Sequence, residues 1–284
     1  MVLNVWRMSL ALLISVILIW FTTGCPLPFM AGIKAWAWLL LSGFVGYFLG
    51  DWCLFKSYIL IGSRCGQLFM TLAPAFTAFF AWVILKQALS WTTLIAIFVT
   101  LSGIFIAVTD SKGAEEGSPI THKGILLGIG AALGQGLGLV LSKIGLDCFI
   151  SNIQESQLDE LTYILPFGSN LIRCIAGTIC YFLWYMISRS KKNQPKAIPL
   201  SCLIHDRKAM KALTITLISG PFLGVGLSLT AVQYTAAGIA STLMATTPIL
   251  ILLPSYWLFK QPITLKSIIG SIISCIGVSL FFLV

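Results

Sequence analysis

Long apolar runs, separated by shorter polar stretches, follow one another along almost the whole chain. A helix needs about 20 apolar residues to cross a bilayer. Nine segments approach that length, and we expect membrane spans at Val5–Thr22, Trp36–Leu54, Gly66–Leu85, Trp91–Val108, Gly124–Leu146, Leu165–Ile187, Leu213–Tyr234, Ile239–Phe259 and Leu265–Val284. The second span is expected to end at Leu54, because Lys56 and Arg64 interrupt the apolar stretch that follows.

The chain contains an internal repeat. Gly46–Val108 aligns without gaps on Gly220–Phe282, at a constant offset of 174 residues. The ten identities noted are Gly46/Gly220, Phe48/Phe222, Leu49/Leu223, Gly50/Gly224, Met70/Met244, Pro74/Pro248, Lys86/Lys260, Gln87/Gln261, Ile95/Ile269 and Gly103/Gly277. Chance similarity between apolar segments does not place glycines, prolines and a Lys-Gln pair in one register, so we infer a duplication. Secondary transporters are commonly built from such repeats, with the solute site between the halves.

The two repeats are unequal. We assign residues 1–109 to a first repeat of four spans, 110–123 to a linker, and 124–284 to a second repeat of five spans. Asn4-Val-Trp-Arg7 resembles Asn170-Leu-Ile-Arg173, yet a complete extra span precedes only the second motif. We expect that the first repeat has lost one helix or that the start codon lies further upstream. Corresponding spans are five apart, an odd number, so the repeats should enter the membrane in opposite orientations.

Composition favours a membrane protein over a soluble one. Hydrophobic residues make up 58% of the chain and charged residues 10%, against roughly 25% charged residues in soluble domains. The mean hydropathy is +0.96. Much of the net charge of +9 lies in the loop Ser188–Ala212, and basic loops beside spans ordinarily set membrane orientation. No nucleic-acid recognition motif accompanies this charge, so we expect no nucleic-acid partner.

The cysteines and histidines do not suggest a metal or disulfide framework. No C-x-x-C pair occurs, and most of the eight cysteines fall within expected spans, where Cys packs as a small hydrophobe. The two histidines lie in polar loops without metal-ligand spacing. We therefore expect no metal and no cofactor.

Several short motifs recur in a fixed order. They are Asn4-x-x-Arg7, Gly46-x-x-x-Gly50-Asp51 and Ala73-Pro74, followed by Gly220-Pro-Phe-Leu-Gly224, Gly238-Ile-Ala-Ser-Thr242, Thr247-Pro248 and Gly270 with Gly277. Each motif is weak alone, but their order, spacing and duplication together resemble EamA-type members of the drug/metabolite transporter superfamily. The resemblance covers the whole chain apart from the absent first family helix.

This resemblance implies a polytopic all-α bundle of two inverted repeats, with ten spans in the family and about nine here. It implies a carrier of small metabolites, often an exporter of amino acids or related compounds. The Gly-Glu pairs common in the family after the fourth and ninth helices are replaced by Lys86-Gln87 and Lys260-Gln261. Any role of those carboxylates therefore does not carry over.

Asp51 is the only acidic residue well inside an expected span. An ionised group at that depth costs about 2.5 kcal/mol or more unless it is paired or hydrated. Two interpretations follow. Asp51 either faces a central cavity and binds a proton or cation, or it is a structural residue near a helix end, hydrogen-bonded to backbone or to Lys56.

Other polar residues in the spans are candidate solute contacts: Trp52, Gln135, Arg173 and Gln233. Gln135 lies mid-span between two glycines, so its amide needs a partner on a neighbouring helix or on a solute. Arg173 is expected to bind an anion, to anchor a loop, or to extend to the membrane interface. Trp52 is a candidate cavity wall, and Lys143 is expected to be an interfacial anchor.

Prolines and glycines inside the spans indicate breaks and close packing. Pro74, Pro221, Pro248 and Pro254 should kink or interrupt their helices, as hinges, as flanks of a site or as passive bends. The glycines between Gly128 and Gly138 lack the Gly-Lys-Ser/Thr ending of a phosphate loop, so they favour close helix packing.

These features favour a secondary carrier in the plasma membrane, which would be the inner membrane of a bacterial cell. Its expected partners are a small-molecule solute, a coupled proton and the lipid bilayer. A non-transporting interaction protein would require neither an intramembrane carboxylate nor matched helix breaks. A membrane-embedded enzyme would need paired carboxylates, a His/Asp set or a Ser/Lys dyad in the spans. We therefore expect no enzymatic activity, and the lack of a nucleotide-binding motif disfavours ATP-driven transport.

Overall fold

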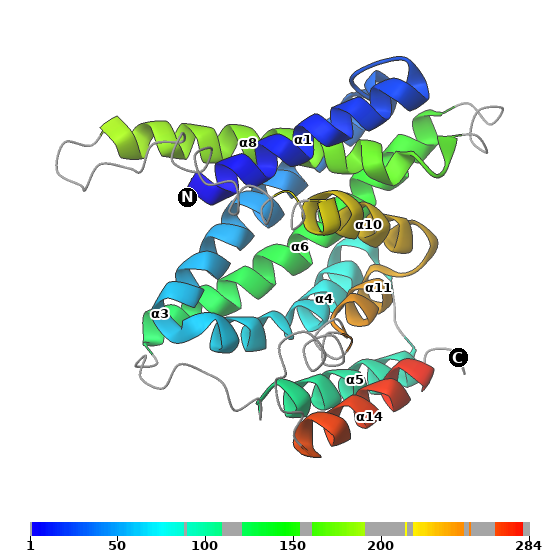
Figure 1. Ribbon diagram of the computed structural model, residues 1–284. Coiled ribbons are helices and arrows are strands. Elements are labelled where there is room, and N and C mark those ends of the chain that lie inside the picture. Colours follow the sequence, from blue (N-terminus) through cyan, green and yellow to red (C-terminus); the bar gives the residue numbers. More distant parts are fainter. Residues whose placement is uncertain are drawn as a thin grey trace. The chain divides into compact units, whose positions relative to one another are not determined.

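The computed structural model describes residues 2–87, 90–109, 121–153, 161–190, 214, 218–246, 250 and 265–280, and every regular element in these ranges is helical (Figure 1). In chain order the elements are α1 (Val2–Thr23), η1 (Phe29–Ala31), α2 (Gly32–Ser42), η2 (Gly43–Gly50), α3 (Asp51–Met70), α4 (Ala73–Leu85), α5 (Trp91–Thr109), α6 (His122–Asn152), α8 (Leu165–Ser190), η4 (Ile218–Gly224), α10 (Val225–Tyr234), α11 (Ala237–Met244) and α14 (Leu265–Leu280). The expected all-α fold is confirmed.

Among the described residues, four helical stretches are long and apolar enough to cross a membrane. They are Val2–Thr23, Phe29–Gly62, His122–Asn152 and Leu165–Arg189. Their surfaces carry large exposed apolar side chains, such as Phe21 and Ile59. A surface of this kind is covered by lipid chains in a bilayer, where helices also satisfy every backbone hydrogen bond internally. The chain is an integral membrane protein.

The helix that contains the second expected span continues beyond the predicted span end at Leu54. The helix continues past Lys56 to Gly62, where a φ of 80° and a ψ of 154° interrupt it. Lys56 is accommodated because its side chain is exposed and its Nζ lies 4.5 Å from the centroid of the Trp52 ring. Glycine adopts such a positive φ without steric cost, so Gly62 ends this stretch.

The third expected span, Gly66–Leu85, consists of two helices instead of one. α3 ends at Met70, a turn follows, and α4 begins at Ala73. Pro74 therefore lies in the first turn of α4, where its missing N–H breaks no helical hydrogen bond. Pro74 was expected to kink or interrupt its span, and the span is interrupted directly before it.

Both repeats contain a π-helical segment at the same place. η2 ends at Gly50 and η4 ends at Gly224, residues that are equivalent under the offset of 174, and α-helix resumes directly after each. Pro221 lies inside η4, but η2 has no proline, so proline alone does not explain the widened turns. The residues common to both segments include the two glycines of each Gly-x-x-x-Gly motif. π-Helical turns are rare and are frequent at functional sites.

The helix interruption that follows each π-helical segment also occurs at equivalent positions in the two repeats. α3 is interrupted at Gly62, and the equivalent residue, Ala236, has the extended conformation (φ −61°, ψ 139°) that separates α10 from α11. The duplication seen in the sequence is therefore a structural repeat, down to the position of its irregular turns.

The helices form two compact units, and each unit draws on both repeats. The first unit contains Met1–Phe48 and Leu141–Tyr234, and the second contains Leu49–Val140 and Thr235–Val284. The repeats are therefore interleaved, because each supplies helices to both compact units.

In the first unit, α8 packs against α1, α2 and α10 (Figure 1). One buried core cluster in this unit consists of Val5, Met8, Ala11, Tyr47, Cys174, Tyr181 and Tyr185. The three tyrosines give this core polar atoms that need partners. The hydroxyl of Tyr181, for example, donates to the carbonyl oxygen of Phe48, 3.4 Å away.

In the second unit, α5 and α14 lie side by side (Figure 1). Gly103 of α5 faces the backbone of Ser274, and Gly277 of α14 faces the backbone of Thr100. These are equivalent pairs under the repeat offset, so one contact occurs twice. Residue numbers rise along one helix as they fall along the other, so the two helices are antiparallel. Equivalent helices running in opposite directions are what inverted repeats require.

Candidate functional site

Asp51 is buried well inside a long helical stretch. It is the first residue of α3, directly after the π-helical segment η2, and its residue is 7% exposed. The continuous helical stretch that contains Asp51 runs from Phe29 to Gly62, and the functional and structural interpretations of Asp51 both stay open. Oδ1 of Asp51 accepts a hydrogen bond of 3.0 Å from Nε2 of Gln135 on α6. Two predicted site residues, 84 positions apart in the chain, are therefore paired.

Small residues bring the helices around this pair close together. A Cβ at Gly136, next to Gln135, would lie 2.9 Å from the backbone nitrogen of Thr77 on α4. At Gly128 the nearest atom is Cδ2 of Phe69, at 2.7 Å. At Gly136 and Gly128 the expectation that the α6 glycines serve close helix packing is confirmed, since a larger residue there would force a neighbouring group to move.

Trp52 follows Asp51 and has an identified cationic partner. The Nζ of Lys56 lies 4.5 Å from the centroid of its ring, a cation–π contact. This contact explains how Lys56 is tolerated one turn further along α3. The role of Trp52 as a cavity wall stays a prediction.

Arg173 is buried within the first unit, at 3% exposure. Its guanidinium carbon lies 4.5 Å from the centroid of the Tyr47 ring. The backbone of α8 is held tightly here, because a Cβ at Gly43 of η2 would meet the Arg173 carbonyl oxygen at 2.4 Å. Close contact between η2 and α8 therefore fixes Arg173 relative to Tyr47.

Asn170 links this arginine site to the second π-helical segment. Its Oδ1 accepts the hydroxyl proton of Tyr47, and its Nδ2 donates to the Pro221 carbonyl oxygen at 2.8 Å. Asn170 is fully buried. Pro221 is part of η4, so one side chain satisfies a backbone carbonyl in a π-helical segment and orients the aromatic ring beside Arg173.

Replacing Asn170 with Leu should destabilise the protein. The change keeps the side-chain volume close to that of Asn but leaves the Tyr47 hydroxyl and the Pro221 carbonyl oxygen without this partner. An unsatisfied buried group costs about 1–3 kcal/mol, so we expect the free energy of unfolding to fall by about 2–4 kcal/mol for two groups. Thermal unfolding in detergent measures this. Thr22→Val, which removes an exposed hydroxyl bonded to the Leu18 carbonyl oxygen, is the control, and equal stability of both variants would contradict the assignment.

Gln233 lies near the end of α10, where Lys143 of α6 contacts its backbone. The Lys143 ammonium donates to the backbone carbonyl oxygen of Gln233 at 3.2 Å and pairs with Asp147 at 3.1 Å. With its side chain 12% exposed, Lys143 bridges α6 and α10, and its place at the membrane interface stays a prediction. Oε1 of Gln233 is buried and has no hydrogen-bond partner among the described residues.

Sequence reasoning located Asp51, Gln135 and Arg173 but missed two of their neighbours. Tyr47 and Asn170 were not singled out, although Asn170 belongs to the repeated Asn-x-x-Arg motif and Tyr47 lies beside Gly46 of a repeated glycine motif. That all five predicted residues contact one solute stays a prediction. Of the helix-breaking prolines, Pro74 starts α4 and Pro221 lies within η4, whereas Pro248 and Pro254 lie outside the described residues.

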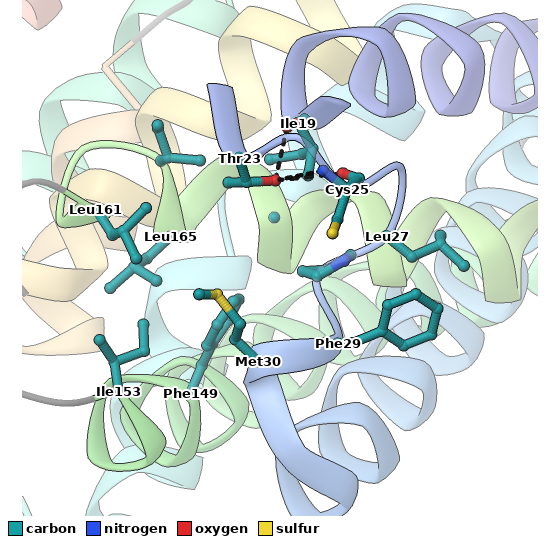
Figure 2. A pocket seen from close by; sticks show the side chains of 13 residues that line it. Ile19, Thr23, Cys25, Leu27, Phe29, Met30, Phe149, Ile153, Leu161 and Leu165 are labelled. Atoms are coloured by element: carbon teal, nitrogen blue, oxygen red, sulfur yellow. Dashed lines mark hydrogen bonds between the residues drawn. The ribbon is translucent and has the colours of Figure 1, made fainter. Parts of the chain in front are cut away.

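The first unit also contains an apolar cavity of about 190 Å³ (Figure 2). It lies where the end of α1, the following loop, the end of α6 and the start of α8 meet, and Met30, Phe149 and Leu165 line it. The Thr23 hydroxyl in its wall is bonded to the Ile19 carbonyl oxygen at 2.8 Å. None of the predicted site residues lines this cavity. Across the part of the chain that the structure covers, no group of three or more His, Cys, Asp or Glu residues could hold a metal ion.

The fold and these residues define a class of protein: a helical membrane protein of two inverted repeats with a buried carboxylate inside a span. The model of the EamA-like transporter family matches residues 1–109 and 122–283, and the chain belongs to this family. It is thus a membrane transporter of the drug/metabolite type. A crystal structure superposes with a TM-score of 0.71 over 99% of this chain and 86% of that one, at 14% identity, and this likeness shows the fold. A search of curated proteins finds no match.

Proposed function

We propose that the chain is a proton-coupled secondary carrier that exports small organic solutes, such as amino acids or related compounds, across the plasma membrane. The observation that carries this proposal is the Asp51–Gln135 pair. A carboxylate that is 7% exposed lies inside a 34-residue helical stretch and is bonded to a neutral amide at 3.0 Å. Intramembrane carboxylates are costly and mark ion or proton pathways. The direction of transport rests on the family resemblance.

The pair suits a reversible proton site. The ionised Asp51 accepts a hydrogen bond from the Gln135 amide, and a protonated Asp51 remains compatible with it, because its second oxygen carries the proton. The Gln135 amide is neutral, so this contact does not favour the charged form of Asp51 through a charge of its own, as a contact with arginine or lysine would. Asp51 can therefore bind and release a proton without losing its orienting contact on α6.

The π-helical segment before Asp51 offers a route from protonation to movement. η2 ends at Gly50, one residue before Asp51, and its equivalent η4 ends at Gly224. A π-turn can convert to an α-turn with a shift in helix register, and such turns are frequent at functional sites. We propose that a change in the charge of Asp51 alters the balance between these two forms in η2, and that this change is one step of alternating access.

Two other functions are weaker. A non-transporting interaction protein would have no use for a buried carboxylate or for two matched π-helical segments. A membrane-embedded enzyme would require a second catalytic group beside Asp51, and the Gln135 amide that bonds to Asp51 does not act as a general acid or base.

Purified protein in liposomes should accumulate solute when a pH gradient is imposed. One coupled proton and a gradient of one pH unit support about a tenfold accumulation. We would test a panel of amino acids and small organic anions and cations, with protein-free liposomes as the control. A protonophore should abolish accumulation. Failure of folded protein to move any member of the panel would favour the non-transporting alternative.

A further inference from the structure

A buried guanidinium group in the first unit has too few partners. Arg173 is 3% exposed, and an arginine does not lose its charge by deprotonation in a protein. Its Nε is buried without a hydrogen-bond partner in the described ranges. The contact identified for its guanidinium group is the face of the Tyr47 ring, at 4.5 Å. A cation–π contact offsets part of the cost of burying a charge, but a buried charge ordinarily requires an oppositely charged partner as well.

The described residues of the first unit do not supply that partner. The carboxylate that they include is Asp147, which is held by Lys143 at 3.1 Å. A second cation, Arg7 of the equivalent Asn-x-x-Arg motif in the other repeat, lies close enough to the buried Cys174 for a Coulombic interaction, as Arg173 does. Cationic side chains from both repeats therefore lie within Coulombic range of one buried residue, Cys174.

The residues around Arg173 hold the Tyr47 ring in a fixed position. The hydroxyl of Tyr47 donates to Asn170, and Asn170 donates in turn to the Pro221 carbonyl oxygen. Both groups are therefore engaged with protein atoms and serve as positioning residues. Arg173 is left with donor capacity, in a planar fork that matches the geometry of a carboxylate or a phosphate.

We infer that Arg173 is the binding group for an oxyanion, a carboxylate or phosphate carried by the transported solute. This inference rests on the proposed function, because it assigns a chemical class to the solute. A bound oxyanion supplies the missing negative charge and receives hydrogen bonds from the guanidinium fork. Its departure leaves Arg173 against Tyr47, which holds the side chain in place for the next solute.

Ligand-induced thermal stabilisation tests the inference without requiring transport. The protein in neutral detergent is mixed with succinate or glycerol 3-phosphate as oxyanion probes, and with succinamide or glycerol as their neutral counterparts. We expect saturable stabilisation by at least one oxyanion probe and none by the neutral compounds. Arg173→Gln should weaken binding of that probe by at least about tenfold. Arg189→Gln, the same change at an exposed position of the same helix, should leave it unchanged.

The outcomes separate this inference from the proposed function. Lack of stabilisation by any oxyanion probe, or equal binding by Arg173→Gln, overturns the role of Arg173, although carrier activity on neutral solutes could still be found. Stabilisation by phosphatidylglycerol, with none by the soluble probes, makes the ligand a lipid headgroup and overturns the assignment to a solute. If Arg173→Gln does not fold, Arg173→Lys keeps the charge without the planar fork, and unchanged binding by that variant counts against the inference. If the protein binds an oxyanion but moves no solute in liposomes, the proposed transport function is overturned, whereas the assignment of Arg173 as an oxyanion-binding group stands.

Discussion

Replacing Asp51 with Asn should abolish solute accumulation driven by a pH gradient. Asn has nearly the same shape as Asp and can still accept a hydrogen bond from Gln135 through its amide oxygen, so the helix contact is preserved. It has no ionisable proton, so the step in which the carrier binds and releases a proton is lost. An accumulation of about tenfold per pH unit in the unmodified protein should fall to about one in the variant.

Solute exchange is the matched measurement for this variant. Exchange of internal for external solute needs the solute site but no net proton movement, so Asp51→Asn should retain it. Gln135→Leu keeps the titratable carboxylate, and we expect it to accumulate solute with an altered solute preference. Accumulation by Asp51→Asn that still depends on pH would assign Asp51 a purely structural role and exclude it from coupling.

Adding a methyl group at Gly277 or at Gly103 should destabilise the second unit. A Cβ at Gly277 would lie 2.5 Å from the backbone nitrogen of Thr100, and one at Gly103 would lie 2.4 Å from that of Ser274. Backbone atoms in a packed helix cannot withdraw as a flexible side chain can, so α5 and α14 would have to separate. We expect each Gly→Ala variant to lose about 2 kcal/mol or more of stability. Because the two contacts are equivalent under the repeat, the two losses should be similar.

Gly130→Ala is the control for these variants. A Cβ there has only Sγ of Cys53 nearby, at 3.6 Å, an ordinary van der Waals distance. Alanine also raises intrinsic helix propensity by about 1 kcal/mol relative to glycine, so this variant should be neutral or slightly more stable. Thermal unfolding of the three variants in the same detergent provides the comparison. Equal stability of Gly277→Ala and Gly130→Ala would show that the α5–α14 contact is looser than the structure indicates.

The sequence by itself determined the class and the construction of this protein. The free energy of moving side chains from water into lipid depends mainly on composition, so hydropathy located the membrane helices. The odd number of helices between equivalent spans required inverted repeats, and α5 and α14 are antiparallel as that argument predicts. The family assignment followed from the order of short motifs and agrees with the matched family.

Helix ends and irregular turns were decided by the tertiary structure. In a hydropathy profile Lys56 interrupts the apolar span. Its long side chain nevertheless keeps its charge at an exposed position beside Trp52, and the helix is first interrupted at Gly62. The π-helical turns of η2 and η4 were not predicted, because almost uniformly apolar segments carry no periodic signal that separates π-helix from α-helix.

The candidate site was predicted in part. A lone aspartate in an apolar span can be recognised as a candidate from the sequence, because burying its charge is costly whichever way the side chain points. Its pairing with Gln135 does not follow from the sequence, because the close approach of α6 depends on how the glycine face of that helix packs. The same holds for Tyr47 and Asn170, whose contacts with Arg173 and Pro221 join segments distant in the chain. Residue type and spacing determine which groups need a partner, and only helix packing decides which partner each group receives.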